Sequence, residues 1–239
     1  MAIFAMADLH LALSNPEKTM EEFGSGWTDY MELIKKNWEE TVGPDDTVLM
    51  PGDSSWAMYI EKAHEDFEFI NSLPGHKLIG RGNHDYWWTT VSKLEKYCAG
   101  EGFDTISFIR NNAIVIEDSV VTGTRGWKLP YESGFCAEDR KIFDREVIRL
   151  GLCLKEVDKA DPEHKLRHIV MLHYPPLTRK CMSSDFSKLL EDSNTDICVY
   201  GHLHGFSHSN AFEGRKDDGT VVEYRCVAAD FLRFKPLKI

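Results

Sequence analysis

The feature that most constrains the fold of this chain is a series of short apolar runs, each followed closely by a side chain with an oxygen or nitrogen donor. The runs are Ala2–Ala7, Thr47–Met50, His76–Ile79, Arg167–Leu172 and Asp196–Tyr200. The donors that follow them are Asp8, Asp53, Asn83, His173 and His202. Runs of this kind are typical of buried strands. Because open α/β sheets carry their sites at the carboxyl ends of strands, we expect the donors to meet in one crevice.

Helical segments separate the first three runs. Asp29–Thr41 has helical spacing, and it places Tyr30, Leu33, Ile34 and Trp38 on one face. Two further helices are expected at Trp56–Leu73 and Thr89–Cys98, and a loop is expected at Leu11–Gly26. The alternation of strand and helix predicts a parallel sheet with crossover helices.

The pattern changes in the second half of the chain. Closely spaced strands with a turn at Asn111-Asn112 indicate antiparallel pairing, and they are Ser107–Ile109, Ala113–Ile116 and Ser119–Thr122. Further helices are expected at Glu138–Lys159 and Asp185–Glu191. A hairpin of Ser207–Phe212 and Val221–Ala228 is expected around Asp217-Asp218-Gly219. We expect one domain, residues 1–239, with two packed sheets and helices outside.

The composition of the chain limits the kinds of binding partner and the cellular compartment that we expect. The 239 residues carry a formal net charge of -11, which argues against long nucleic acid and anionic membranes. No apolar run approaches the roughly 20 residues that span a bilayer, and the first residues read as a strand without a basic leader. Six cysteines occur without a C-x-x-C pair. These features favour a cytoplasmic protein with reduced thiols.

The donor set indicates a particular chemistry. Imidazole and carboxylate ligands suit Mn, Fe, Zn, Ni and Co, and the lack of thiolate spacing argues against a structural zinc site. The donors are enough for two neighbouring ions. Two ions about 3.5–4 Å apart can stabilise the attacking and leaving oxygens of a phosphoryl transfer. The pattern therefore predicts hydrolysis of a phosphate ester.

Five elements in fixed order resemble the calcineurin-like metallophosphoesterases. They are Asp8-Leu9-His10, Gly52-Asp53, Gly82-Asn83-His84-Asp85, His173 and Gly201-His202-Leu203-His204. The resemblance implies an α/β fold, a four-layer α/β/β/α sandwich of two mixed sheets flanked by helices. It also implies a dinuclear-metal hydrolase in which a hydroxide bridging the ions attacks phosphorus in line.

The resemblance assigns a role to each motif residue. Asp8, His10 and His204 would hold the first ion, Asn83, His173 and His202 the second, and Asp53 would bridge them. His84 would stabilise or protonate the leaving oxygen, with Asp85 orienting its imidazole.

Two departures from the family pattern concern substrate preference. Gly52-Asp53 is followed by Ser54-Ser55-Trp56, where many members carry another acidic residue. Leu203 stands between the last two histidines, where threonine is common. Neither position supplies a metal ligand in this interpretation.

Substrate-binding candidates near the motifs are Tyr86, Arg125 and Arg179. Arg125 lies in a glycine-rich loop where it could grip an anion, and an ordinary surface role is equally compatible with its sequence context. Tyr86 could line the pocket or pack a helix. We predict a phosphatase or phosphodiesterase for a small-molecule ester. The alternatives are a nuclease of the same fold, or a metal-binding scaffold without catalysis.

Overall fold

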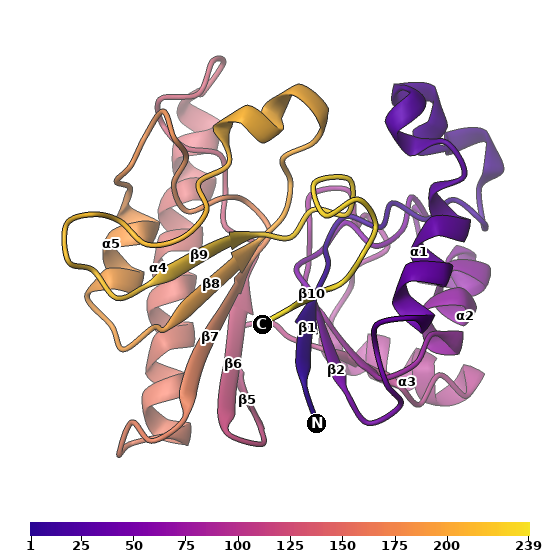
Figure 1. Ribbon diagram of the computed structural model, residues 1–239, viewed down its shortest axis with the longest axis horizontal. Coiled ribbons are helices and arrows are strands. Elements are labelled where there is room, and N and C mark those ends of the chain that lie inside the picture. The colour runs from indigo at the N-terminus through magenta and orange to yellow at the C-terminus, as the bar shows by residue number, and fades with distance from the viewer.

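The computed structural model describes all 239 residues as two five-stranded sheets packed face to face, with helices on both outer sides (Figure 1). The first sheet contains β1 (Ile3–Ala5), β2 (Thr47–Met50), β3 (His76–Ile79), β4 (Ile106–Phe108) and β10 (Leu237–Lys238). The second contains β5 (Ala113–Ile116), β6 (Ser119–Thr124), β7 (Arg167–Leu172), β8 (Ile197–Tyr200) and β9 (Glu223–Cys226). The predicted α/β/β/α sandwich is confirmed.

Each sheet is parallel apart from one edge strand. The first sheet has the order β10-β1-β2-β3-β4, and only β10 runs antiparallel. The second has the order β5-β6-β7-β8-β9, and only β5 runs antiparallel. The sheets are therefore mixed, and most strands end at a common edge.

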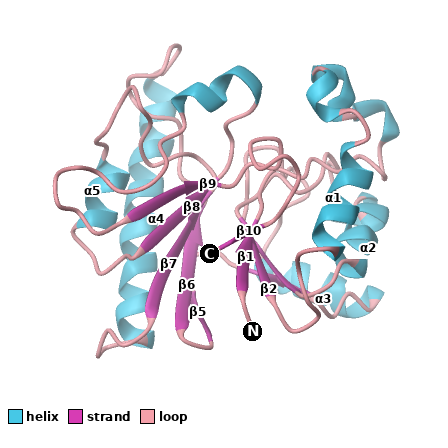
Figure 2. Cartoon of the chain, viewed as in Figure 1, coloured by secondary structure: helices cyan, strands magenta, loops and turns pink.

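The helices form the two outer layers, as Figure 2 shows. Next to the first sheet lie α1 (Tyr30–Glu39), α2 (His64–Ser72) and α3 (Val91–Glu101), and next to the second lie α4 (Ala137–Ala160) and α5 (Asp185–Glu191). In β2, Val48 and Met50 belong to the core beneath the helices, whereas Leu49 belongs to the core between the sheets. Because successive side chains point to opposite faces, a strand covered on both sides reads as continuously apolar.

Helix α1 supports the loop that follows β1. Tyr30, Ile34 and Trp38 are buried at four-residue spacing, whereas Leu33 is 40% exposed and, contrary to the prediction, lies off the buried face. The Tyr30 hydroxyl donates a 2.7 Å hydrogen bond to the carbonyl oxygen of His10. This contact ties the position of the His10 loop to the packing of α1.

The predicted helix over Trp56–Leu73 is too long. Helix α2 begins at His64, and a short 3₁₀ helix, Ile60–Lys62, precedes it. The ring of Trp56 stacks on His10 at a centroid distance of 4.9 Å, and the Ser55 hydroxyl donates to the buried carboxylate of Asp66. These long-range contacts hold the chain in an irregular path where local spacing favours a helix.

The predicted pairing across Asn111-Asn112 is wrong. Strand β4 pairs with β3 in the first sheet and β5 pairs with β6 in the second, so this turn carries the chain between sheets. Antiparallel pairing is confirmed for β5 and β6 only. The local sequence predicts the turn, but it does not indicate with which strand each of the two flanking strands will pair.

The predicted hairpin over Ser207–Phe212 and Val221–Ala228 is also wrong. Gly205–Asn210 is a 3₁₀ helix, and β9 pairs in parallel with β8. A single antiparallel bridge joins Gly214 to Tyr224. The segment predicted as a loop contains three short 3₁₀ helices, Pro16–Lys18, Met20–Phe23 and Ser25–Trp27. Strand β10 was not predicted from the sequence.

No helix of this protein is both long and apolar enough to cross a membrane.

Candidate metal centre

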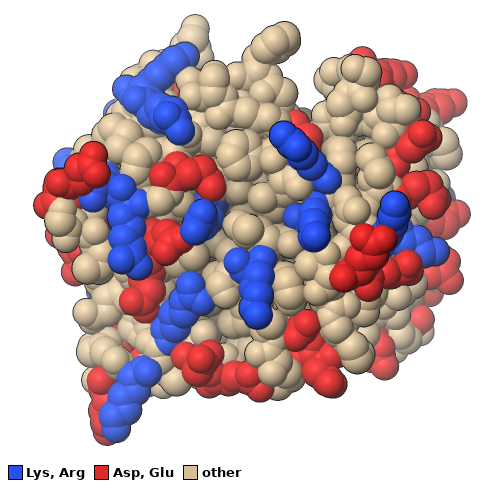
Figure 3. All heavy atoms as spheres, viewed as in Figure 1, with Lys and Arg blue, Asp and Glu red and all other residues tan.

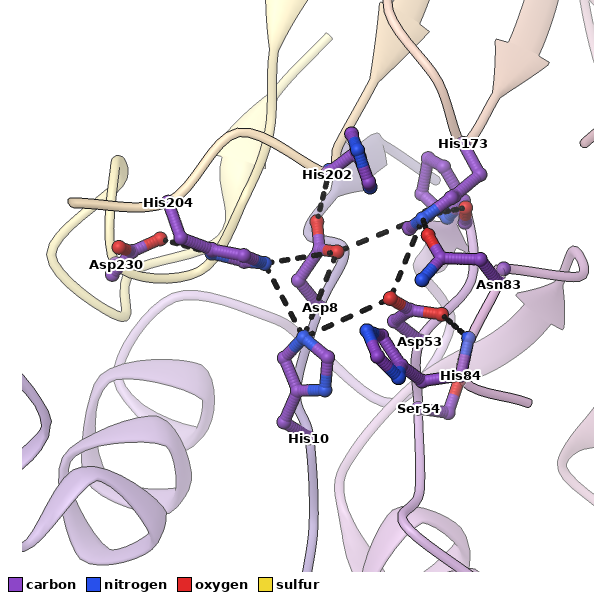
Figure 4. A network of polar contacts seen from close by, with 12 residues as sticks. Asp8, His10, Asp53, Ser54, Asn83, His84, His173, His202, His204 and Asp230 are labelled. Carbon is purple, nitrogen blue, oxygen red and sulfur yellow. Dashed lines mark hydrogen bonds and ion pairs between the residues drawn. The ribbon is translucent and has the colours of Figure 1, made fainter. Parts of the chain in front are cut away.

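The motif residues come together where the two sheets meet at the carboxyl ends of their strands (Figure 4). Asp8 follows β1, Asp53 follows β2, Asn83 follows β3 and His173 follows β7. The last histidine pair follows β8. The structure therefore gathers side chains that lie up to 196 positions apart in the sequence, from Asp8 to His204.

One group of donors consists of Asp8, His10 and His204. The Nε2 atoms of the two imidazoles lie 3.2 Å apart. Oδ1 of Asp8 lies 3.4 Å from Nε2 of His204 and 4.0 Å from Nε2 of His10. All three donor atoms lie within 4.0 Å of one another, so they can share one ion.

A second group consists of Asp8, Asp53 and His173. Nε2 of His173 lies 3.3 Å from Oδ2 of Asp53 and 2.7 Å from Oδ1 of Asn83. The same Asp53 oxygen lies 3.8 Å from Nε2 of His10. Oδ2 of Asp53 therefore lies between the two groups, where a shared ligand would have to be.

His202 lies beside the second group, but its ring nitrogens are in neither group. Its backbone N–H donates a 2.9 Å hydrogen bond to Oδ2 of Asp8. Its ring lies 5.1 Å from the His173 ring and 4.1 Å from the Tyr174 ring, between centroids. The side chain is at the edge of the centre, as Figure 4 shows.

Four of the donor residues have a strained backbone conformation. Asp8, His10, Asp53 and His202 all have positive φ, at 61°, 45°, 54° and 71°. This region is uncommon for residues other than glycine and costs on the order of 1–3 kcal/mol each. Backbone bonds from Asp8 N to Gly52 O and from His10 N to Asp53 O hold the first two loops together. The surrounding fold thus maintains a geometry that the isolated loops would not favour.

Two motif glycines are required by close approach to the carboxylates. A Cβ atom on Gly82 would lie 2.0 Å from Oδ1 of Asp53, and one on Gly201 would lie 2.1 Å from Oδ2 of Asp8. No side chain can be accommodated at these distances. The glycines in the motifs therefore provide room for the acidic residues.

Burial shapes the charge state of the imidazoles. Burial, with the neighbouring histidines, holds the pKa of His10 and His173 well below the usual range and lowers that of His202 to about 3. Burial also lowers the pKa of His204, but the carboxylates of Asp8 and Asp230 more than offset it and raise the value to about 10. Neutral imidazole is the form that binds metals. At His204, a cation at Nε2 would take the place of the proton.

The donor set fits divalent ions. Oδ1 of Asp8 is buried and accepts no hydrogen bond, although a buried carboxylate oxygen without a partner is costly. Burial and the nearby Asp85 and Asp8 raise the pKa of Asp53 well above its usual range, which marks an excess of negative charge that cations would relieve. Carboxylate, imidazole and amide oxygen suit first-row transition ions.

A family model described as calcineurin-like phosphoesterase matches residues 1–206. This chain belongs to the calcineurin-like phosphoesterase family. No curated protein matches it significantly. Phosphopantetheinyl hydrolase (PptH) from Mycobacterium tuberculosis shares 16% identity over 100% of this chain and 95% of its own, with a TM-score of 0.54. Protein AQ665 of unknown function from Aquifex aeolicus shares 17% over 99% and 95%, with a TM-score of 0.50. These two likenesses show the fold alone.

His84 of this phosphoesterase lies at the open edge of the centre. The side chain is half-buried and makes no hydrogen bond within the protein, and burial lowers its pKa. Its ring packs against Trp56 at a centroid distance of 4.5 Å. The backbone N–H donates to Oδ1 of Asp53 at 2.7 Å, so the ring is held beside the donor groups.

Asp85 does not orient His84, contrary to the prediction. Its carboxylate accepts hydrogen bonds from the backbone N–H groups of Gly82, Asp53 and Ser54, at 2.6, 2.8 and 2.9 Å. Burial raises the pKa of Asp85 to about 6, although these bonds oppose the shift. Because the donors come from the loops after β2 and β3, Asp85 joins the two loops and positions Asp53.

The three substrate-binding candidates lie in different places. Tyr86 is 55% exposed, with its ring 6.3 Å from that of His84 between centroids. Arg125 lines a separate pocket next to His173. Arg179 is exposed, and its Nε donates to the carbonyl oxygen of Ala211. Tyr86 and Arg125 are thus brought close to the centre, whereas Arg179 makes a structural contact.

Asp230 was not predicted from the sequence. Its carboxylate accepts a 2.9 Å hydrogen bond from Nδ1 of His204 and another from the backbone of Gly205. This bond fixes the tautomer that leaves Nε2 of His204 free for an ion. Asp230 belongs to no motif, and its position after β9 carried no signal that distinguished it from a surface aspartate.

An aromatic groove opens on the His84 side of the centre and was also missed. It encloses about 420 Å³. The apolar side chains lining it are Met20, Phe23, Trp27, Trp56 and Phe206, and the polar ones include His10, His84 and His204. Phe206 is fully exposed and Phe23 is 71% exposed. Exposed aromatic side chains around a cleft mark a binding surface.

Proposed function

We propose that this protein is a metal-dependent phosphohydrolase that binds two divalent ions and hydrolyses phosphate mono- or diesters of small molecules. The observation that carries this proposal is the pair of donor groups that share Asp8, with Oδ2 of Asp53 between them. Family membership supports it, as does the buried Oδ1 of Asp8, which accepts no hydrogen bond.

We assign Asp8, His10 and His204 to the first ion and Asn83, His173 and His202 to the second, with Asp53 binding both. Mn, Fe, Zn, Ni and Co all suit these ligands. When bound, the ions would supply charge stabilisation for the phosphoryl oxygens and a lowered pKa for water, the chemistry that an in-line attack on phosphorus requires. The chain's own contribution is to hold the ligands in strained loops whose geometry the fold imposes.

His84 is proposed to donate a proton to the leaving oxygen. Its ring is half-buried, lies beside the donor groups and forms no hydrogen bond that would compete for its nitrogens. A general acid needs this freedom, because it must reach the reacting oxygen directly. Asp85 would act indirectly, by positioning the backbone of Asp53.

The aromatic groove is proposed to hold the leaving group. His84 is part of the groove wall, so an alcohol protonated by His84 would lie in this space. Trp27, Trp56 and Phe206 offer a large apolar surface, which favours an ester whose alcohol is flat or apolar. Tyr86, next to His84, is a further candidate for contact with this group.

A small-molecule substrate agrees with the surface charge. On the face shown in Figure 3, lysines and arginines are interspersed with acidic side chains, and acidic groups gather over α1 and α2. A nuclease would favour a continuous basic stripe. We also propose a single domain over residues 1–239 and a cytoplasmic location, which is supported by six cysteines that form no disulfide.

The test is hydrolysis of p-nitrophenyl phosphate and bis-p-nitrophenyl phosphate by metal-free protein, with Mn, Fe, Ni, Co or Zn added back. Metal-dependent turnover is expected, and the preferred ester separates phosphatase from phosphodiesterase. Cleavage of RNA or DNA in preference to both esters would favour the nuclease. Two ions bound without turnover of any ester would favour the non-catalytic scaffold.

A further inference from the structure

A second pocket, lined by four arginines, lies next to the candidate metal centre. Arg81 follows β3, Arg110 follows β4, Arg125 follows β6 and Arg149 lies on α4. Three of these residues follow strands of the two sheets, the fourth lies on a helix, and all four line the same pocket. Glu146 is the only acidic residue that lines the pocket.

The carboxylate of Glu146 already interacts with other side chains of the fold. The side chain of Glu146 is 1% exposed, accepts a 2.8 Å hydrogen bond from the hydroxyl of Thr124 and forms an ion pair with Arg149. Arg125 lies 3.9 Å from the same carboxylate. Glu146 therefore neutralises Arg149 and, at longer range, Arg125.

The other two arginines have no ion-pair partner. Neither Arg81 nor Arg110 forms an ion pair or donates a side-chain hydrogen bond, and Nε of Arg81 is buried without a partner. Both residues are half-buried. Burial and the neighbouring Arg149 and Arg81 lower the pKa of Arg110, as expected where cations repel one another in a confined space.

A purely structural network does not account for this arrangement. Structural networks pair opposite charges, because an uncompensated buried charge is costly. Here four guanidinium groups and one carboxylate line the same pocket, and two of the four form no ion pair. Guanidinium groups bind phosphate and carboxylate oxygens in pairs of parallel hydrogen bonds, so the missing component has the chemistry of an oxyanion.

We propose that this arginine pocket binds an oxyanion of phosphate type. His173 connects it to the metal centre, since His173 lines the pocket while its Nε2 faces Asn83 and Asp53. The oxyanion has two possible sources with the same chemistry. It is either a second phosphate group of the substrate, an alternative that rests on the proposed function, or a free inorganic anion.

The first experiment is calorimetric titration of the metal-loaded protein with inorganic sulfate. Arg110→Gln is the informative variant, because Arg110 has no partner in the fold to lose. Arg145→Gln is the matched control, since Arg145 lies 4.0 Å from Glu146 on the same helix but outside the pocket. We expect Arg110→Gln to weaken sulfate binding by about tenfold or more, the scale of one charge-assisted hydrogen bond. The control should bind like wild type.

Thermal unfolding at low salt shows whether Arg110 destabilises the fold by charge repulsion or supports it. Without an oxyanion, Arg110→Gln should raise the melting temperature, because it removes an unpaired cation. Sulfate should then raise the melting temperature of wild type more than that of the variant. Equal sulfate binding by wild type and Arg110→Gln, or a lower melting temperature of the variant at every sulfate concentration, would overturn the proposal.

The source of the oxyanion follows from kinetics on two esters, an alkyl monophosphate and an alkanediol bisphosphate. If Arg110→Gln lowers kcat/KM for the bisphosphate alone, the pocket holds a substrate phosphate. If both esters react as with wild type while sulfate binding is lost, the pocket holds a free anion. Absence of turnover would count against the proposed function only, because sulfate binding is measured without it.

Discussion

Two pockets adjoin the candidate metal centre, and they differ in the ligands that they can attract. The aromatic groove on the His84 side offers rings and a fully exposed Phe206, whereas the arginine pocket beside His173 offers four guanidinium groups, two of which form no ion pair. Apolar walls favour a ligand by removing surface from water, and arginines favour one by charge and hydrogen bonding.

The metal ligands alone therefore do not select a substrate. The donor groups suit phosphoryl chemistry in general, and the surroundings of the centre decide which group lies on each side. An ester with an apolar alcohol suits the groove, and an additional oxyanion suits the arginine pocket. The following experiments test whether the two pockets act separately.

The largest effect is expected for Asp53→Asn. Oδ2 of Asp53 lies between both donor groups, so loss of its charge should release both ions and abolish turnover. Metal content per chain measures this directly. Sulfate binding in the arginine pocket should survive, because none of the four arginines pairs with Asp53. Two ions retained at wild-type affinity would show that Asp53 is not the shared ligand.

His84→Ala should keep both ions and lose about 2–4 decades in kcat, the usual scale for a general acid. The loss should be large for an alkyl phosphate and small for p-nitrophenyl phosphate, whose leaving oxygen needs no proton. Steady-state kinetics on the two esters gives the comparison, with metal content as the control. An equal loss on both would place the leaving group away from the His84 side of the centre.

Asp230→Ala should affect only the ion next to the groove. Asp230 fixes His204 by a 2.9 Å hydrogen bond and touches no donor of the second group. Loss of such a supporting carboxylate typically weakens metal affinity by about 10–100-fold. Titration of metal-free variant with Mn should show one weakened step and one unchanged step. Equal weakening of both steps would mean that the groups do not load independently.

The smallest effect is expected for Phe206→Ala. Because Phe206 is fully exposed, its removal should leave the melting temperature unchanged. KM for an aryl phosphate should rise by about threefold to tenfold, the scale of one aromatic contact, with little change for methyl phosphate. Ile148→Ala is a control, since Ile148 is 66% exposed on α4. Unchanged KM for the aryl ester would count against the groove as leaving-group site.

Elements specified by neighbouring residues could be predicted from sequence. The bounds of β2, β3, β5, β7 and α5 agree with the prediction, because an apolar run ended by turn residues is local information. The motif donors could be recognised for the same reason, as each follows a strand within a few positions. Their individual roles as ligands stay proposals.

The pairing and register of the strands could not be predicted from the same local patterns. β4 and β5 are close in sequence but belong to different sheets, and the choice depends on which surfaces remain to be covered. The role expected of Asp85 failed likewise. Its carboxylate is surrounded by three backbone N–H groups from two loops, and no local pattern reports that these donors will be there.

Short patterns along the chain predicted two packed sheets with helices outside and the candidate metal ligands, and the resemblance of the motifs implied the sandwich. What adjoins the centre depends on the packing of distant segments. The arginine pocket draws on positions from Pro51 to His173, and the groove on positions from His10 to Ser207. Such side chains become neighbours only when strands pair and sheets pack, so no residue spacing in the sequence predicts the two pockets.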